Sequence, residues 1–145
     1  ARTYTKNLVN EFANDCEVIS VGSAELVTLA EQSLRGEPAP LEKLSEILKP
    51  LFDNQQLDTI VLACTHFPLI KKQLLGASPR PINWIDSGEA IARRVSSLLA
   101  TTPSTEKSHH DTQNTAVFTM PSSDIDLLNK TLKELLLTHI DYIKL

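Results

Sequence analysis

Residues 59–68 read TIVLACTHFP, an apolar run that ends abruptly in reactive side chains. The β-branched residues at positions 59–63 predict a central strand. Pro68 suits the first turn of a helix, where the N–H that proline lacks would have no partner. Cys64 is therefore predicted to lie where the carboxyl end of a strand meets a helix N-terminus. Ligands bind at that edge of open α/β sheets, and the helix dipole there favours the thiolate form of a cysteine.

The composition narrows the class of protein. The chain has 145 residues, the length of one or two small domains, and its 41% hydrophobic and 22% charged residues are ordinary for a soluble globular protein. A net charge of -4 without a stretch rich in Lys and Arg argues against a nucleic-acid partner. No apolar run approaches the ~20 residues that span a bilayer, and no signal peptide opens the sequence. Two cysteines do not make a disulfide scaffold, so a reducing cytoplasm is the expected compartment.

Helical and strand patterns alternate along the chain, which predicts an α/β fold: a mostly parallel sheet with helices on both faces. The polar residues 101–114 are predicted to form an exposed loop. Strands are predicted at residues 16–21, 59–63, 82–85, 116–120 and 139–145. Helices are predicted at residues 3–13, between Ser23 and Gly36, at 41–51, 68–75 and 90–100, and from Ser122 or Ser123 to about 136.

Several of these helices carry capping residues at their ends. Ser23 can accept a hydrogen bond from the free N–H groups of the helix that follows it, and Gly36 suits the position after a helix C-terminus. Pro50 is expected to end or kink its helix. Asp86 and Glu89 have the spacing of a capping box at the start of the next helix.

Two longer strings carry a resemblance to a known family. ACTHFPLI at residues 63–70 resembles the second cysteine motif of the glutamate racemases, which belong to the aspartate/glutamate racemase superfamily. An Asp-Ser-Gly string follows about twenty residues later, at Asp86, as in that family. SAELVTLAE at residues 23–31 is similar to the family's mid-chain helix. The resemblance extends over essentially the whole chain and is greatest to the proteobacterial members.

The resemblance implies a two-domain enzyme, of which this sequence matches the C-terminal half. Glutamate racemases have two similar α/β domains with glutamate in the cleft between them, and each domain supplies one catalytic cysteine. The motifs around the first cysteine, a second Asp-Ser-Gly loop and Cys-Asn-Thr, do not occur upstream of Cys64. Residues 1–85 would therefore belong to the second domain, whereas residues 86–145 would complete the first domain, whose N-terminal half is missing here. The start of the chain inside a predicted helix fits this interpretation.

Racemisation by proton transfer needs a base on one face of the α-carbon and an acid on the other. The family uses no cofactor, and no lysine here lies in a setting typical of pyridoxal phosphate. Cysteine suits both roles because its unperturbed pKa of ~8.5 is close to the working pH. The resemblance implies that Cys64 exchanges the α-proton from one face and that His66 assists the transfer.

The resemblance also implies roles for two neighbouring groups. Glu31 corresponds to the family's auxiliary acid, which would orient His66 and hold it partly protonated. Thr65 corresponds to a threonine that contacts the substrate. Each residue also has an ordinary structural interpretation: Glu31 as a solvated helix charge, Thr65 as a helix cap, and His66 as a core or capping histidine. Cys64 with His66 is a weak metal signal, since no further Cys/His cluster lies nearby.

Cys16 is not expected to be the second catalytic thiol. It lies at the start of a predicted strand, whereas Cys64 lies at the end of a parallel one. A strand of five or six residues at ~3.3 Å each separates these two edges by roughly 17–20 Å, which is too far to flank one carbon. Cys16 is predicted to be structural, His109 and His110 are predicted to be solvated, and the chain by itself is predicted to be inactive.

The sequence thus predicts part of an enzyme that interconverts L- and D-glutamate for peptidoglycan synthesis. Alternatives are a racemase for aspartate or another amino acid, and a non-catalytic binding domain that keeps the fold. The expected partners are glutamate, the absent N-terminal half, and a second copy of the chain through exposed apolar surface. A UDP-linked muramyl-alanine activates some proteobacterial relatives, and nothing in the sequence decides whether it binds here.

Overall fold

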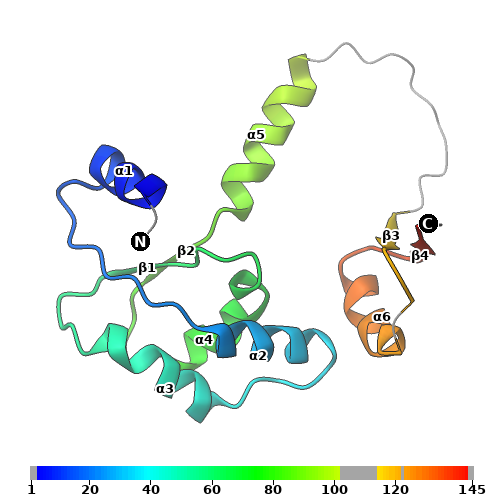
Figure 1. Cartoon of the computed structure of the whole chain (residues 1–145), viewed down its shortest axis with the longest axis horizontal. Coiled ribbons are helices and arrows are strands. Elements are labelled where there is room, and N and C mark those ends of the chain that lie inside the picture. The colour runs from blue at the N-terminus through cyan, green and yellow to red at the C-terminus, as the bar shows by residue number, and fades with distance from the viewer. Residues whose placement is uncertain (1–2, 102–113, 122, 144–145) are drawn as a thin grey trace.

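The computed structural model describes residues 3–101, 114–121 and 123–143 (Figure 1). Ser122, His109, His110 and most of the predicted loop at residues 101–114 lie outside the described residues. Within the described residues, no helix is both long enough and apolar enough to cross a membrane.

The strands form two parallel pairs. β1 (Thr59–Val61) pairs with β2 (Asn83–Ile85), so that Ile60 lies opposite Trp84. β3 (Thr115–Phe118) pairs with β4 (His139–Tyr142). The prediction of an α/β fold with parallel strands is confirmed, and the strands are divided between two small sheets.

The predicted helices are confirmed, with two of the expected signals at their ends. Ser23 Oγ accepts a hydrogen bond from the N–H of Leu26 at 3.0 Å, as an N-cap should. Gly36 has a φ of 92°, the left-handed conformation that ends helices and favours glycine. The helix after Cys64 begins with a 3₁₀ turn, η1. The elements are α1 (Thr3–Phe12), α2 (Ala24–Leu34), α3 (Leu41–Phe52), η1 (Phe67–Ile70), α4 (Lys71–Ala77), α5 (Gly88–Thr101) and α6 (Ile125–Glu134).

The main core lies between β1–β2 and the helices α2, α3 and α4, which gather on one side of these strands (Figure 1). Leu44, Ile70 and Leu74 are the largest of its fully buried side chains. Ile60 faces this core, whereas the next residue, Val61, faces away and is 62% exposed. Successive side chains of a strand point to opposite faces, so the described helices cover the inner face of β1–β2.

Three helices, α1, α5 and α6, have no buried residues. In Figure 1, α5 extends away from the core that β1, β2 and the neighbouring helices form. Its apolar residues Ile91, Val95 and Leu98 recur at helical spacing and are exposed. An amphipathic helix of this kind is stable when its apolar face packs against another surface.

The predicted strand at residues 16–21 does not form. These residues are exposed, and no described strand pairs with them. A strand needs a neighbouring strand with which its backbone N–H and C=O groups form hydrogen bonds. An alternating pattern of apolar residues does not provide one. β1 is likewise shorter than the predicted run, because its pairing with β2 ends at Val61.

Two helix ends also differ from the prediction. Pro50 does not end α3, which continues to Phe52. Proline removes only its own N–H bond to the preceding turn, and residues after it can still bond back, as the N–H of Asp53 does to Lys49 at 3.0 Å. The N-cap of α6 is Asp124, whose side chain makes no capping hydrogen bond. Ser123, predicted as the cap, instead donates its hydroxyl proton to Asp124 Oδ1 at 3.0 Å.

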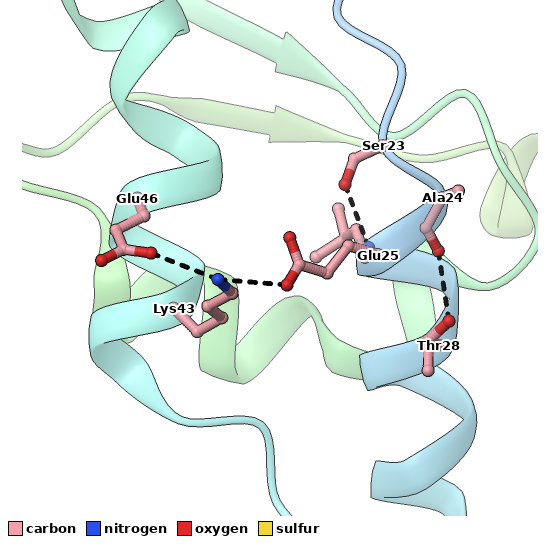
Figure 2. A network of polar contacts seen from close by, with 7 residues as sticks. Ser23, Ala24, Glu25, Thr28, Lys43 and Glu46 are labelled. Atoms are coloured by element: carbon pink, nitrogen blue, oxygen red, sulfur yellow. Dashed lines mark hydrogen bonds and ion pairs between the residues drawn. The ribbon is translucent and has the colours of Figure 1, made fainter.

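Ion pairs join α2 to α3 (Figure 2). Lys43 Nζ of α3 lies 3.2 Å from Glu25 Oε1 of α2 and 3.4 Å from Glu46 Oε2 of its own helix. The hydrogen bond to Glu25, and then the charge of Glu25, raise the pKa of Lys43 above its ordinary value. All three side chains are at least 44% exposed, so these ion pairs contribute little to the stability of the fold.

β3, α6 and β4, here called the C-terminal unit, contact the end of α2. Thr131 Oγ1 donates a hydrogen bond to the carbonyl oxygen of Leu34 at 2.8 Å. Arg35 Nε lies 3.7 Å from Asp124 Oδ2. These two contacts place α6 beside the C-terminal end of α2. The boundary between residues 85 and 86, predicted to separate two domains, stays a prediction.

Candidate active site

The chain turns immediately after β1, and Cys64 lies in this turn. The N–H of Leu62 still donates to the carbonyl oxygen of Ile85, at 2.8 Å, but the N–H of Ala63 bonds back to Val61 at 3.0 Å. η1 follows, with Pro68 in its first turn as predicted. Cys64 is half-buried at this junction, so it is not enclosed in the core.

Cys64, His66 and Glu31 form a line of polar contacts. Cys64 Sγ lies 3.7 Å from His66 Nδ1, and the other ring nitrogen, Nε2, lies 3.5 Å from Glu31 Oε1. A carboxylate only accepts hydrogen bonds, so the proton of a neutral ring belongs on Nε2, toward Glu31. Nδ1 is then free to accept the thiol proton of Cys64. That transfer would leave a thiolate beside an imidazolium, whose charge Glu31 would balance.

The line of contacts continues from Glu31 to α6. Glu31 Oε2 lies 3.9 Å from Arg35 Nη1, one helical turn further along α2, and Arg35 Nε lies 3.7 Å from Asp124 Oδ2. Sequence reasoning missed both Arg35 and Asp124. The i,i+4 spacing of Arg35 from Glu31 could have pointed to the first of them. No local signal could have pointed to Asp124, because a tertiary contact brings it to α2.

An open cleft of about 310 Å³ lies beside these residues. Thr65 is exposed at its edge, and it does not cap η1, whose N-cap position is occupied by His66. Leu128 brings α6 into the wall of the cleft. No group of three or more His, Cys, Asp or Glu residues that could hold a metal ion occurs in the described part of the chain. The cleft is lined by Glu31, Leu34, Arg35, Thr65, His66, Leu69 and Leu128.

Cys16 lies outside this cluster. It is exposed and belongs to no strand, so the separation expected from strand length does not apply to it. Its Sγ lies 3.6 Å from Asp15 Oδ1. The negative charge of Asp15 raises the pKa of the Cys16 thiol above its ordinary value.

Asp86 ends β2 at the same edge of the sheet as Cys64. Its Oδ2 accepts a hydrogen bond from Lys71 Nζ at 2.8 Å, and its Oδ1 accepts one from the N–H of Gly88 at 3.0 Å. The bond from Lys71, followed by that from Gly88, holds the pKa of Asp86 below its ordinary value. Glu89 pairs with Arg93 and does not complete the predicted capping box. Asp86 therefore connects the start of α4 to the start of α5.

The chain is similar to three known proteins, two by sequence and one by structure. No family model matches the chain. The glutamate racemase of Klebsiella pneumoniae is 52% identical over 99 residues, which are 68% of this chain and 35% of that protein. The glutamate racemase of Serratia proteamaculans is 50% identical over 101 residues, again 35% of its length. The crystal structure of Escherichia coli glutamate racemase, in complex with L-glutamate and the activator UDP-MurNAc-ala, superposes with a TM-score of 0.87 at 36% identity.

The sequence matches cover 68% and 69% of this chain, the superposition covers nearly all of it, and each match includes only part of the relative. The superposition includes 98% of the chain and 53% of the E. coli protein. The chain spans about a third of the length of the curated relatives that it matches, as the 35% coverage shows. The sequence motif around Cys64, the identities near 50% and the superposition agree with one another. The chain is therefore homologous to the glutamate racemase family and corresponds to part of the length of its members.

Proposed function

We propose that Cys64 is one of the two proton-transferring thiols of a cofactor-independent glutamate racemase. The observation that carries the proposal is the unbroken line of contacts from Cys64 Sγ through His66 to Glu31, beside an open cleft. His66 would take the thiol proton, and Glu31 would be the auxiliary acid that orients the ring. Thr65, exposed at the edge of the cleft, would contact the substrate. The E. coli relative is in complex with L-glutamate, which supports glutamate as the substrate.

The proposed reaction moves one proton on each face of the substrate. The Cys64 thiolate removes the α-proton, so that the Cα–H bond breaks and an S–H bond forms. A second thiol on the opposite face gives its proton to the carbanion, which inverts the stereocentre. The reverse direction exchanges the two roles. Because a thiol can act as acid or base near neutral pH, no other group has to change its function.

The second thiol would come from outside this sequence. Cys16 is exposed in a segment without strand pairing, and no contact links it to His66 or Glu31 in the described residues. We assign residues 1–85 to a second domain and residues 86–145 to a first domain that an N-terminal half completes. The E. coli chain is about twice as long as the segment it shares with this one, which leaves room for such a half.

We further propose a cytoplasmic enzyme that supplies D-glutamate for peptidoglycan. The activator bound to the E. coli relative, UDP-MurNAc-ala, is a candidate activator for the complete protein. In the chain studied alone, the apolar face of α5 would associate with a second copy, because Ile91 and Val95 are 58% and 48% exposed. Val95→Lys should then shift sedimentation toward the monomer, and a wild-type chain that sediments as a monomer contradicts this part of the proposal.

The deciding experiment follows the α-proton. Full-length protein incubated with L-glutamate in D₂O should give D-glutamate that carries deuterium at Cα. The 145-residue chain by itself should give none, because it lacks the second thiol. Turnover by the chain alone would contradict the two-thiol assignment. Exchange of aspartate but not glutamate would identify a related racemase, and binding of glutamate without any exchange would identify a non-catalytic domain.

A further inference from the structure

Arg35 lies between the residues of the proposed active site and the C-terminal unit. Its Nη1 lies 3.9 Å from Glu31 Oε2, and its Nε lies 3.7 Å from Asp124 Oδ2. The Nε atom is buried and forms no hydrogen bond to any described residue. A guanidinium with a buried N–H donor is stabilised most when a carboxylate lies on each side of it. Two such carboxylates also limit the positions that the guanidinium can adopt.

Among the contacting residues Cys64, His66 and Glu31, the side chain of Glu31 most needs a neighbour that limits its positions. Its side chain is 47% exposed, and its contact with His66, at 3.5 Å, is longer than a typical charged hydrogen bond. An exposed glutamate samples several rotamers, so only a fraction of them brings Oε1 to the imidazole ring. A cation at i+4 on the same helix face favours the rotamers that point along the helix toward it.

The link to α6 makes this support depend on tertiary structure. Asp124 is the N-cap residue of α6, and the same helix donates a hydrogen bond from Thr131 to Leu34 at the end of α2. Leu128 of α6 also lines the cleft next to Arg35. The packing of the C-terminal unit on α2 therefore limits where the Arg35 side chain can lie.

We propose that Arg35 is a positioning residue that holds Glu31 against His66 and is itself anchored by Asp124. The inference rests on the proposed function, since it assigns a purpose to the contact between Glu31 and His66. Arg35 touches neither Cys64 nor the proton it transfers. Its influence on the thiol would pass entirely through Glu31.

The test is a double-mutant cycle read out by alkylation of Cys64. The 145-residue chain is used in a Cys16→Ser background, so that iodoacetamide reports one thiol, and the rate is measured from pH 6 to 9. Arg35→Ala should slow alkylation at pH 7 by roughly two- to fivefold, the range of an exposed ion pair. It should have no effect when Glu31→Gln is already present, because two residues that act through one contact are not additive. Arg35→Lys should restore part of the rate.

Lys43→Ala is the matched control. Lys43 of α3 is also a cation paired with a glutamate of α2, but its partner Glu25 lies on the side of α2 that faces α3 (Figure 2). It should leave the alkylation profile unchanged, whereas a general loosening of α2 would alter both variants alike. Circular dichroism confirms that each variant is folded at the temperature of the assay.

Two results would overturn the inference. One is an Arg35→Ala effect of equal size with and without Glu31→Gln, which would mean that the cation acts on the thiol directly. The other is no effect of Arg35→Ala in the Cys16→Ser background, whether or not Glu31→Gln itself slows the reaction. Alkylation requires no second thiol, so failure of the deuterium experiment would refute the racemase assignment without changing the outcome of this cycle.

Discussion

Two segments of this chain have similar sequences and different structures. Residues 16–21 and residues 59–64 each combine a short β-prone run with a cysteine at one end. The second becomes β1 and the turn that presents Cys64 to His66. The first is an exposed segment without regular structure, and the thiol of its cysteine lies beside the neighbouring Asp15.

The difference lies in what surrounds each segment. β1 pairs with β2 along one side, and Ile60 is buried against the helices that pack on these strands. Leu62 is also buried, and its backbone N–H adds one more hydrogen bond to β2. Residues 16–21 have neither a described strand beside them nor a helix that covers Val18. A segment thus forms a strand when it has a neighbouring strand to pair with and helices to pack against. A high β propensity is not sufficient by itself.

The largest expected difference between the two segments is in catalysis. In the full-length protein, Cys64→Ser should lower the rate of glutamate racemisation by at least ~10²–10⁴-fold, because the α-proton loses its acceptor on one face. Cys16→Ser should leave the rate within about twofold of the wild type. Circular dichroism of both variants serves as the control for folding. A Cys64→Ser enzyme with a near-normal rate would remove the functional distinction between the two cysteines.

The next difference is in stability. Ile60→Ala should lower the free energy of unfolding by about 2–5 kcal/mol, because Ile60 is only 8% exposed and its truncation leaves a cavity. Ile19→Ala removes the same atoms from a side chain that is 41% exposed, and the change should stay within about 0.5 kcal/mol. Urea unfolding of the two variants measures both values. Equal losses would show that residues 16–21 are packed as well as β1.

A smaller difference concerns the reactivity of Cys16. Its pKa is raised mainly by the charge of Asp15, so Asp15→Asn should increase its alkylation rate at pH 8 by roughly two- to fivefold. The rate at Cys64 should not change, because the structure gives Asp15 no contact with Cys64 or His66. Mass spectrometry of alkylated peptides separates the two sites. An effect at Cys64 would mean that the two segments lie closer together than the structure indicates.

The smallest expected effect concerns the ion pair between Lys71 and Asp86, the residue that follows β2. The folded pKa of Asp86 lies below its unfolded value of ~3.9, so the Lys71–Asp86 contact stabilises the fold above that pH and loses its effect as the pH falls through the folded pKa. Asp86→Asn should therefore lower stability modestly at pH 6, and the difference from wild type should shrink as the pH falls through the folded pKa of Asp86. Thermal melts across this range measure it. A difference that grows on acidification would reverse the assigned sign.

Much of the fold follows from local signals. Ser23 and Gly36 define the ends of α2 because capping depends on one or two residues. The apolar stripe of α3 and the strand before Cys64 follow from periodicity. The expectation that Pro50 ends α3 is wrong, because proline removes a single hydrogen bond to the preceding turn and the helix continues to Phe52 without it. The N-terminal end of α6 differs from the prediction, because the side chain of Asp124 contacts the end of α2.

The site residues also differ in whether local sequence or tertiary packing places them. Cys64 and His66 are close in sequence, so a strand followed by a turn is enough to predict their neighbourhood. Glu31 was assigned from family resemblance, and its 3.5 Å contact with His66 exists because α2 packs across η1. Arg35 lies on the predicted helix, but its purpose depends on an α6 residue that no local pattern connects to it.

The amino-acid sequence alone determined the α/β class, the helix positions and the reactive turn at Cys64, because each depends on interactions within a few residues. The tertiary structure alone decided that residues 16–21 remain unpaired and that the strands form two small sheets. It also decided that Glu31, Arg35 and Asp124 meet beside His66. Contacts between distant segments depend on which surfaces can be buried together, and that choice is made by packing of the whole chain.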